Sequence, residues 1–192
     1  VAAFICEPLI LGAGGMLIYD AATLAEMHRI CKRHDVLFIA DEVMTAFGRT
    51  GTLFASEQAK IAPDIICVAK GITGGSIPLA ATLCTEAIFD AHYSQDRSRM
   101  FFHSSSYTAN PIACAAAAAN LDIWRSEAVL SRIDAVSKAQ SACLAQIAND
   151  PRFENTRQIG TIAAFELRGA SAGYLADVAL SLRRKLLDRN VL

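Results

Sequence analysis

The two stretches VLFIADE (residues 36–42) and IICVAKGITGG (residues 65–75) determine the fold predicted for this chain. Each begins with a short apolar run rich in Val and Ile, which is typical of strands buried on both faces of a parallel sheet. The first run ends at Asp41 and the second at Lys70. Because open α/β sheets bind ligands at the carboxyl ends of their strands, we expect this acid and this amine to meet at one sheet edge.

The pair Asp41 and Lys70 is suited to holding a pyridoxal phosphate cofactor. A lysine ε-amine can form an imine with a carbonyl, and such a site also needs a carboxylate opposite the pyridine nitrogen. That carboxylate keeps the nitrogen protonated, since a nearby opposite charge favours the charged form, and the protonated ring then accepts electrons from a carbanion. A structural alternative fits equally well: Asp41 caps the next turn, and Lys70 is a strand-end charge that faces solvent.

Val43 follows Asp41 by two residues. If the strand continues that far, the two side chains share one strand face, and Val43 packs on the cofactor ring. An ordinary core valine would have the same burial, so the two hypotheses differ only in what the side chain contacts.

The composition describes a globular chain with a substantial core. Hydrophobic residues make up 53% of the 192 residues and the formal net charge is -1, so we expect no binding to nucleic acid. The basic cluster at residues 183–185 is predicted to lie on the solvent face of a helix. No apolar stretch has the length of a membrane span and no signal peptide is visible, so we expect a cytoplasmic protein without membrane contact.

Six cysteines, at positions 6, 31, 67, 84, 114 and 143, include no C-x-x-C pair. Most lie in apolar runs, which favours buried, reduced thiols of a cytosolic protein over disulfides. The chain has no initiator Met, opens inside an apolar run, and stops at residues 190–192, where another strand is expected to begin. We therefore expect an internal piece of a longer protein.

The order of the predicted elements is that of an α/β domain followed by part of a second domain. Besides the two strands above, the patterns predict a strand at 1–6, a helix at 20–34 with Asp20 as its N-cap, a strand at 78–85, and helices at 86–92 and 111–125. We expect residues 1–125 to form part of a large cofactor-binding domain. Residues 126–192 are predicted to begin a smaller α+β domain, with helices at 126–149 and 174–190 and a strand at 161–167.

The first predicted helix carries Leu24, Met27 and Cys31 as an apolar stripe. His28, Cys31 and His34 suggest a metal site on the same helix. Positions i, i+3 and i+6 rotate the third residue well away from the first, however, so one ion could not easily bind all three. We predict no metal site.

The loop at residues 11–16, LGAGGM, follows Glu7 at the end of the first predicted strand. It contains neither a Gly-Lys-Ser/Thr sequence nor the G-x-G-x-x-G spacing, so we do not expect it to bind phosphate. For Glu7, a structural role and a role near the substrate both remain open.

Residues 103–111 form a polar block, HSSSYTANP, directly before an alanine-rich helix. Asn110 and Pro111 are suited to the N-cap and the first helical position. The serines at 104–106 offer hydroxyl and backbone N–H groups to an anion. A polar loop that needs small residues would explain the same sequence.

Separated blocks together resemble the signature of the class III, pyridoxal-phosphate-dependent aminotransferases: FIADEVMTAFGRTG (38–51), APDI (62–65) and AKGITGG (69–75). The resemblance extends from Glu7 to about Leu167. It implies a fold-type I transferase with a mostly parallel central sheet and flanking helices. In such an enzyme Lys70 holds the cofactor covalently and acts as catalytic acid and base, while Asp41 pairs with the ring nitrogen. The loop that contains Arg49 is mainly structural in this family.

The block at 103–111 resembles the family sequence His-Gly-x-Thr-Phe-x-Gly-Asn-Pro, in which the Thr binds the cofactor phosphate of the neighbouring subunit. Ser106 occupies the position of this Thr and keeps its hydroxyl. The resemblance therefore implies a homodimer with composite active sites. Leu11 stands where the family often has Gln, and it cannot make the side-chain hydrogen bonds of that residue.

The blocks at 77–83 and 103–111 are most similar to one subgroup of this family. That subgroup transfers an amino group from S-adenosylmethionine to 8-amino-7-oxononanoate and so makes 7,8-diaminononanoate for biotin biosynthesis. Met44, where many family members have Gln, fits the same subgroup. Two alternatives stay open: an ω-amino-acid:pyruvate or ornithine-type aminotransferase, and a catalytically silent relative that binds a small molecule.

Overall fold

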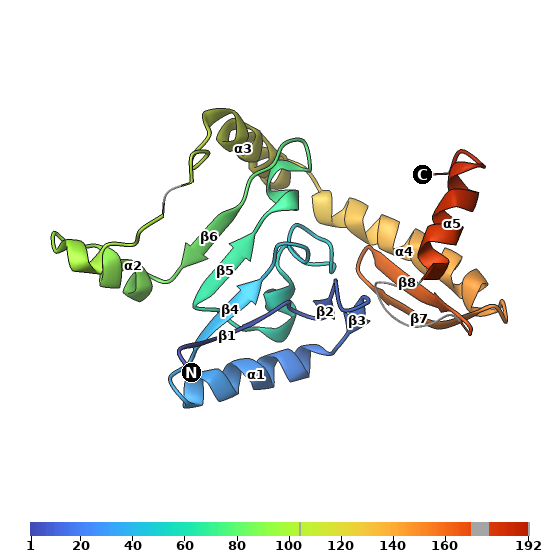
Figure 1. Ribbon diagram of the computed structural model, residues 1–192, viewed down its shortest axis with the longest axis horizontal. Helices are drawn as coiled ribbons and strands as arrows, with labels where there is room; N and C mark the ends of the chain where they lie inside the picture. The colour runs from blue at the N-terminus through green and yellow to red at the C-terminus, as the bar shows by residue number, and fades with distance from the viewer. Residues whose placement is uncertain (104, 170–176, 192) are drawn as a thin grey trace.

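The computed structural model describes residues 1–103, 105–169 and 177–191. A four-stranded sheet organises the first part of the chain, in the order β1 (Ala3–Cys6), β4 (Leu37–Asp41), β5 (Ile65–Val68) and β6 (Ala81–Cys84) (Figure 1). The first three strands are parallel, and β6 runs antiparallel to β5. The predicted α/β class with a mostly parallel sheet is therefore confirmed, and three strands end at the same edge.

Helix α1 (Ala21–Arg33) packs on this sheet and closes the core. Its N-cap is Asp20, as predicted, whose carboxylate accepts a 2.6 Å hydrogen bond from the backbone N–H three residues later. Leu24 and Cys31 of the helix are buried in one apolar cluster with Phe38 of β4. The predicted stripe thus faces the sheet, and its burial fixes the helix beneath β4.

A small hairpin that was not predicted lies between β1 and α1. It consists of β2 (Ile10–Leu11) and β3 (Leu17–Ile18), joined by the Gly-rich loop. The Glu7 carboxylate accepts a 3.0 Å hydrogen bond from the Gly12 N–H and so links the residue after β1 to this loop. This contact supports the structural role of Glu7.

After β6 the chain forms α2 (Glu86–His92), the short helix η3 (Arg97–Arg99) and α3 (Pro111–Ser126). The bounds of α2 match the prediction, and α3 ends one residue beyond it. The Asn110 side-chain oxygen accepts hydrogen bonds from the first free N–H groups of α3, at 3.0 and 3.3 Å, which confirms Asn110 as the N-cap.

The remainder of the chain folds as a helix packed on a β-hairpin. The elements are α4 (Val129–Ala148), β7 (Phe153–Ile159), β8 (Ile162–Leu167) and α5 (Asp177–Leu187) (Figure 1). Strand β7 was not predicted. Of the helix predicted at 174–190, residues 174–176 lie outside the described residues, residues 177–187 form α5, and residues 188–190 form a turn after it. The basic cluster at 183–185 is exposed on α5, as predicted.

The β7–β8 hairpin is joined to the first part of the chain by hydrogen bonds to backbone carbonyl oxygens. The Arg157 guanidinium donates hydrogen bonds to the carbonyl oxygens of Gly15 and Met16, at 2.5 and 2.8 Å. The Thr161 N–H donates to the Arg49 carbonyl oxygen at 2.9 Å. The division of the chain at residue 125 into two domains stays a prediction.

The cysteines are less buried than the sequence indicates. All six are free thiols, but the only buried one is Cys31: Cys6 and Cys67 are half-buried, and Cys84, Cys114 and Cys143 are exposed. The prediction was wrong for the last three because they lie on an edge strand and on helices with few neighbours in this chain, where an apolar run does not imply burial. Among the described residues, no helix is both long and apolar enough to cross a membrane.

Candidate active site

The predicted catalytic lysine, Lys70, and the predicted cofactor-binding acid, Asp41, lie at the same edge of the central sheet. Asp41 is the last residue of β4, and Lys70 follows β5 after a single residue. In the parallel register Asp41 is level with Cys67, so Lys70 lies three residues further toward the carboxyl edge. The sequence-based expectation that this acid and this amine meet at one edge is therefore consistent with the topology.

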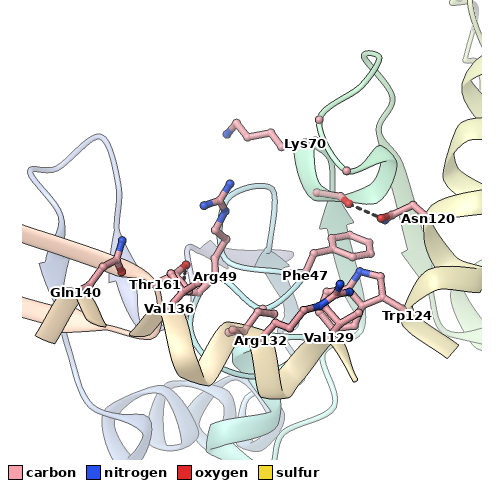
Figure 2. A pocket seen from close by; sticks show the side chains of 15 residues that line it. Phe47, Arg49, Lys70, Asn120, Trp124, Val129, Arg132, Val136, Gln140 and Thr161 are labelled. Carbon is pink, nitrogen blue, oxygen red and sulfur yellow. Dashed lines mark hydrogen bonds between the residues drawn. The ribbon is translucent and has the colours of Figure 1, made fainter. Parts of the chain in front are cut away.

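The backbone at Lys70 has an unusual conformation. Lys70 begins the short helix η2 (Lys70–Thr73) with a φ of 48°, in the left-handed region that non-glycine residues seldom adopt. The Asn120 side chain on α3 donates a hydrogen bond of 2.9 Å to the carbonyl oxygen of Gly71 (Figure 2) and one of 3.1 Å to that of Ile72. Strained residues of this kind persist where surrounding contacts fix them, and they cluster at functional sites.

The exposed Lys70 side chain borders two cavities. The larger has a volume of about 440 Å³ and lies between η2, the loop after β4, the end of α3 and α4 (Figure 2). The smaller has a volume of about 230 Å³ and lies beside Met16 and Met44. Arg49 borders both cavities together with Lys70, so two cationic side chains reach into the same region. This region therefore favours an anionic or electron-rich ligand.

The apolar wall of the larger cavity comes from aromatic and aliphatic side chains far apart in the sequence. The rings of Phe47 and Trp124 meet edge to face, with their centroids 6.1 Å apart. Ile133 and Val136 of α4 also line this cavity. A site that combines an apolar wall with a few polar groups has the composition of a small-molecule pocket.

Asp41 and Val43 are half-buried and line neither of these two cavities. The Asp41 carboxylate accepts a 3.1 Å hydrogen bond from the Val43 N–H. The strand does not continue to Val43, because the chain turns directly after Asp41. The condition under which both side chains would share one strand face is therefore not met. The contact of Val43 with a cofactor ring stays a prediction, as does the pairing of Asp41 with the ring nitrogen.

Ser106 is exposed in the turn that precedes α3 and borders neither cavity. The structure of this chain thus does not bring Ser106 together with Lys70. A Ser106 that binds the cofactor of a neighbouring subunit must lie away from the Lys70 of its own chain, as it does here. Of the other two serines in the block, Ser104 lies outside the described residues.

The histidines of α1 have ordinary structural contacts. A ring nitrogen of His28 lies 3.2 Å from the carbonyl oxygen of Ala62, and His34 forms the C-cap of the helix. Among the described residues, no group of three or more His, Cys, Asp or Glu side chains is arranged to hold a metal ion.

Three residues at the site were not identified from the sequence as functional. Asn120 fixes the carbonyl groups after Lys70, and Arg49 shares both cavities with it. Glu42, next to Asp41, is fully buried and accepts several hydrogen bonds. Of these, only Glu42 carried a signal in the sequence, because an acid in an otherwise apolar context needs nearby donors.

The model of the family described as "Aminotransferase class-III" matches residues 1–185. The chain belongs to the class III aminotransferases. The family predicted from the blocks around Asp41 and Lys70 is thereby confirmed. An adenosylmethionine-8-amino-7-oxononanoate aminotransferase from Synechococcus elongatus is 42% identical over 193 residues, which cover 100% of this chain and 45% of the relative. The relative of the same name from Nitratidesulfovibrio vulgaris is 43% identical over 166 residues, covering 86% of this chain and 31% of the relative.

Solved structures of aminotransferases have the same fold as this chain. The adenosylmethionine-8-amino-7-oxononanoate aminotransferase from Methanocaldococcus jannaschii superimposes with a TM-score of 0.88 at 33% identity, over 97% of this chain and 45% of that one. A thermostable (S)-enantioselective omega-transaminase from Thermomicrobium roseum superimposes with a TM-score of 0.80 at 35% identity. The match covers 87% of this chain and 37% of that one. This class III chain thus spans less than half the length of these relatives, and its resemblance to the predicted subgroup is confirmed.

Proposed function

We propose that the whole protein is a pyridoxal-phosphate-dependent aminotransferase of biotin biosynthesis. It transfers an amino group from S-adenosylmethionine to 8-amino-7-oxononanoate and forms 7,8-diaminononanoate. The observation that carries the proposal is the position of Lys70, an exposed amine at the mouth of two cavities and at the same sheet edge as Asp41. The names of the relatives at about 42% identity supply the substrate pair.

The residues of the sheet edge fit the cofactor. The Lys70 amine is exposed beside a cavity of about 440 Å³, and a carboxylate ends the adjacent strand. When bound, pyridoxal phosphate supplies an electron sink for the electron pair left at the substrate carbon. Lys70 would hold the cofactor and then, as a free amine, move a proton between the substrate carbon and C4′.

Asp41 would keep the ring nitrogen protonated, since a carboxylate close to that nitrogen favours its charged form. The N–H of Val43 already orients one carboxylate oxygen, and the Val43 side chain would pack against the ring. Ser106 would bind the cofactor phosphate in the active site of the partner subunit. That last role makes the functional unit a homodimer with composite sites, which we propose to act in the cytoplasm.

Although the loop that contains Arg49 is mainly structural in the resembled family, we propose that Arg49 binds an anionic group of the substrate in this protein. Its guanidinium is exposed and borders both cavities with Lys70, and a guanidinium can hold a carboxylate through two parallel hydrogen bonds. The substrate 8-amino-7-oxononanoate carries a carboxylate far from its reacting keto group, so a cation at some distance from Lys70 suits it.

A comparison of amino donors tests the proposed reaction. Purified whole protein is incubated with 8-amino-7-oxononanoate and either S-adenosylmethionine or alanine, and 7,8-diaminononanoate is measured. We expect product with S-adenosylmethionine. Turnover with alanine alone would instead favour the second candidate, an ω-amino-acid or ornithine-type aminotransferase, to which the likeness to the T. roseum omega-transaminase points. Cofactor binding without turnover of any donor would identify a catalytically silent relative.

A further inference from the structure

Glu42 is a buried acid for which the proposed chemistry has no direct use. It follows Asp41 in the sequence, and its exposed fraction is 0%. Its carboxylate accepts hydrogen bonds from the Thr45 hydroxyl at 2.5 Å, the Ala55 N–H at 3.0 Å, and the N–H and hydroxyl of Ser56 at 2.8 and 2.7 Å. All four donors come from the loop after β4 and from the start of the short helix η1 (Ala55–Ala59).

A carboxylate is a demanding side chain at such a place. Removing it from water is costly unless hydrogen bonds replace the lost hydration, and an apolar side chain of the same volume would avoid that cost. With both oxygens in use, the Glu42 carboxylate ties the end of β4 to residues 13 and 14 positions later. This one side chain therefore links the two ends of the intervening loop.

The loop that Glu42 closes contacts the turn that carries Lys70. The Phe47 N–H donates to the Leu53 carbonyl oxygen at 2.6 Å, so the loop forms a tight internal turn. The Phe47 side chain presses on Gly71, where an added Cβ would lie 2.7 Å from the Phe47 Cβ. Glu42 is thus linked to Asp41 as its neighbour in the chain, and to Lys70 through the loop, Phe47 and Gly71.

We propose that Glu42 is a positioning residue that fixes the Asp41 carboxylate and the Lys70 amine relative to each other. The inference rests on the proposed function, since it assigns Glu42 a role toward the same cofactor. A displacement of about 1 Å at a reacting group can cost on the order of a hundredfold in rate. Loss of this tie should therefore affect catalysis and cofactor binding beyond its effect on stability.

Asp64 supplies a matched control. Its side chain is also buried, and its carboxylate accepts hydrogen bonds from the Phe38 N–H at 2.8 Å and from Lys32. Asp64 directly precedes β5, at the edge of the sheet opposite to Lys70. The variant Asp64→Asn should destabilise the fold without altering the active edge.

The experiment compares Glu42→Gln, Asp64→Asn and wild type in the whole protein. The measurements are thermal stability, cofactor affinity, kcat, KM, and the pH at which the near-visible absorbance of the Lys70-bound cofactor changes. A glutamine side chain keeps the shape but presents an NH₂ group to donors, so we expect weaker cofactor binding, a shifted absorbance titration, and a kcat lowered about tenfold or more with little change in KM. Asp64→Asn should lose only stability. Ser56→Ala removes one of the four donors, the Ser56 hydroxyl, and should give smaller changes in the same direction. It tests the inference if Glu42→Gln does not fold.

The outcomes separate this inference from the proposed function. Wild type that binds no cofactor on Lys70 would overturn the proposed function and this inference with it. Wild type that binds the cofactor, with Glu42→Gln and Ser56→Ala indistinguishable from Asp64→Asn in cofactor affinity, absorbance titration and kcat, would overturn this inference alone.

Discussion

The side-chain amide of Asn120 donates a 2.9 Å hydrogen bond to the carbonyl oxygen of Gly71, 49 residues earlier in the sequence. The same nitrogen donates a second hydrogen bond, of 3.1 Å, to the carbonyl oxygen of Ile72. Helix α3 thereby holds the turn in which Lys70 has a left-handed conformation. The side chain at position 120 must donate to these two carbonyl oxygens. A residue without a side-chain donor at this position should therefore leave the turn that carries Lys70 less firmly held.

Asn120→Ala is expected to lower the free energy of unfolding by about 1–2 kcal/mol, since it removes two hydrogen bonds to backbone carbonyl groups. It should also lower kcat, because the turn with Lys70 loses its support. Denaturant titration and steady-state kinetics of the whole protein measure the two effects. The control is Asn149→Ala, whose amide bonds the Ala145 carbonyl oxygen at the exposed end of α4. Equal effects of both substitutions on kcat would show that Asn120 has no special role.

Gly71→Ala tests the contact between the turn and Phe47. An added Cβ would lie 2.7 Å from the Phe47 Cβ, which cannot swing away as the end of a long side chain could. We expect a loss of about 1–3 kcal/mol in stability, the usual cost of overpacking, together with a lower kcat. Gly75→Ala is the control: its φ is +81° and nothing lies within 4 Å of the added atom, so only backbone strain of about 1 kcal/mol is expected. A kcat for Gly71→Ala as high as that of Gly75→Ala would contradict the role of this contact.

Asp64 should contribute a pH-dependent part of the stability. Burial raises its pKa, but the hydrogen bonds from Lys32 and the Phe38 N–H outweigh that effect, so the pKa of Asp64 is lowered from its ordinary value. A carboxyl group whose pKa is lower in the folded state stabilises the fold above its unfolded pKa of about 3.9 and loses this contribution as the pH falls through the folded value. The difference in unfolding free energy between wild type and Asp64→Asn should therefore be constant near pH 6 and shrink below about pH 4. Denaturant titrations across this range measure it, and a difference that does not change with pH would contradict the assignment.

Asp41→Asn is expected to lower kcat on the order of a hundredfold, because an amide cannot keep a ring nitrogen protonated as a carboxylate does. The substitution preserves size and can still accept the hydrogen bond from the Val43 N–H. Protein stability should therefore change little. A near-normal kcat in Asp41→Asn would refute the electrostatic role of this residue.

Much of the fold could be predicted from local signals. The apolar runs that end at Asp41 and Lys70 gave β4 and β5 correctly, and the caps Asp20 and Asn110 marked the starts of α1 and α3. The hairpin β2–β3 was missed because strands of two residues are too short to have a periodicity. Strand β7, with the sequence FENTRQI, was missed because its polar residues show no clean alternation.

The candidate site was only partly predictable, because several of its contacts join residues far apart in the sequence. The ends of two parallel strands placed Asp41 and Lys70 at one edge. The bonds from Asn120 to η2 and from Ala55 to Glu42 depend on how the loop and α3 pack. The condition set for Val43, a strand that continues past Asp41, is not met, because the chain turns directly after Asp41 and the buried Glu42 stabilises that turn. The contact of Val43 with a cofactor ring stays a prediction.

The most direct test of the central claim is to identify the residue that binds the cofactor. The whole protein is loaded with pyridoxal phosphate, reduced with borohydride, digested and analysed by mass spectrometry. We expect the loaded protein to absorb near the visible range and the reduced cofactor to be attached to Lys70, with neither result in Lys70→Ala. Attachment to another lysine, or no attachment in wild type, would contradict the account.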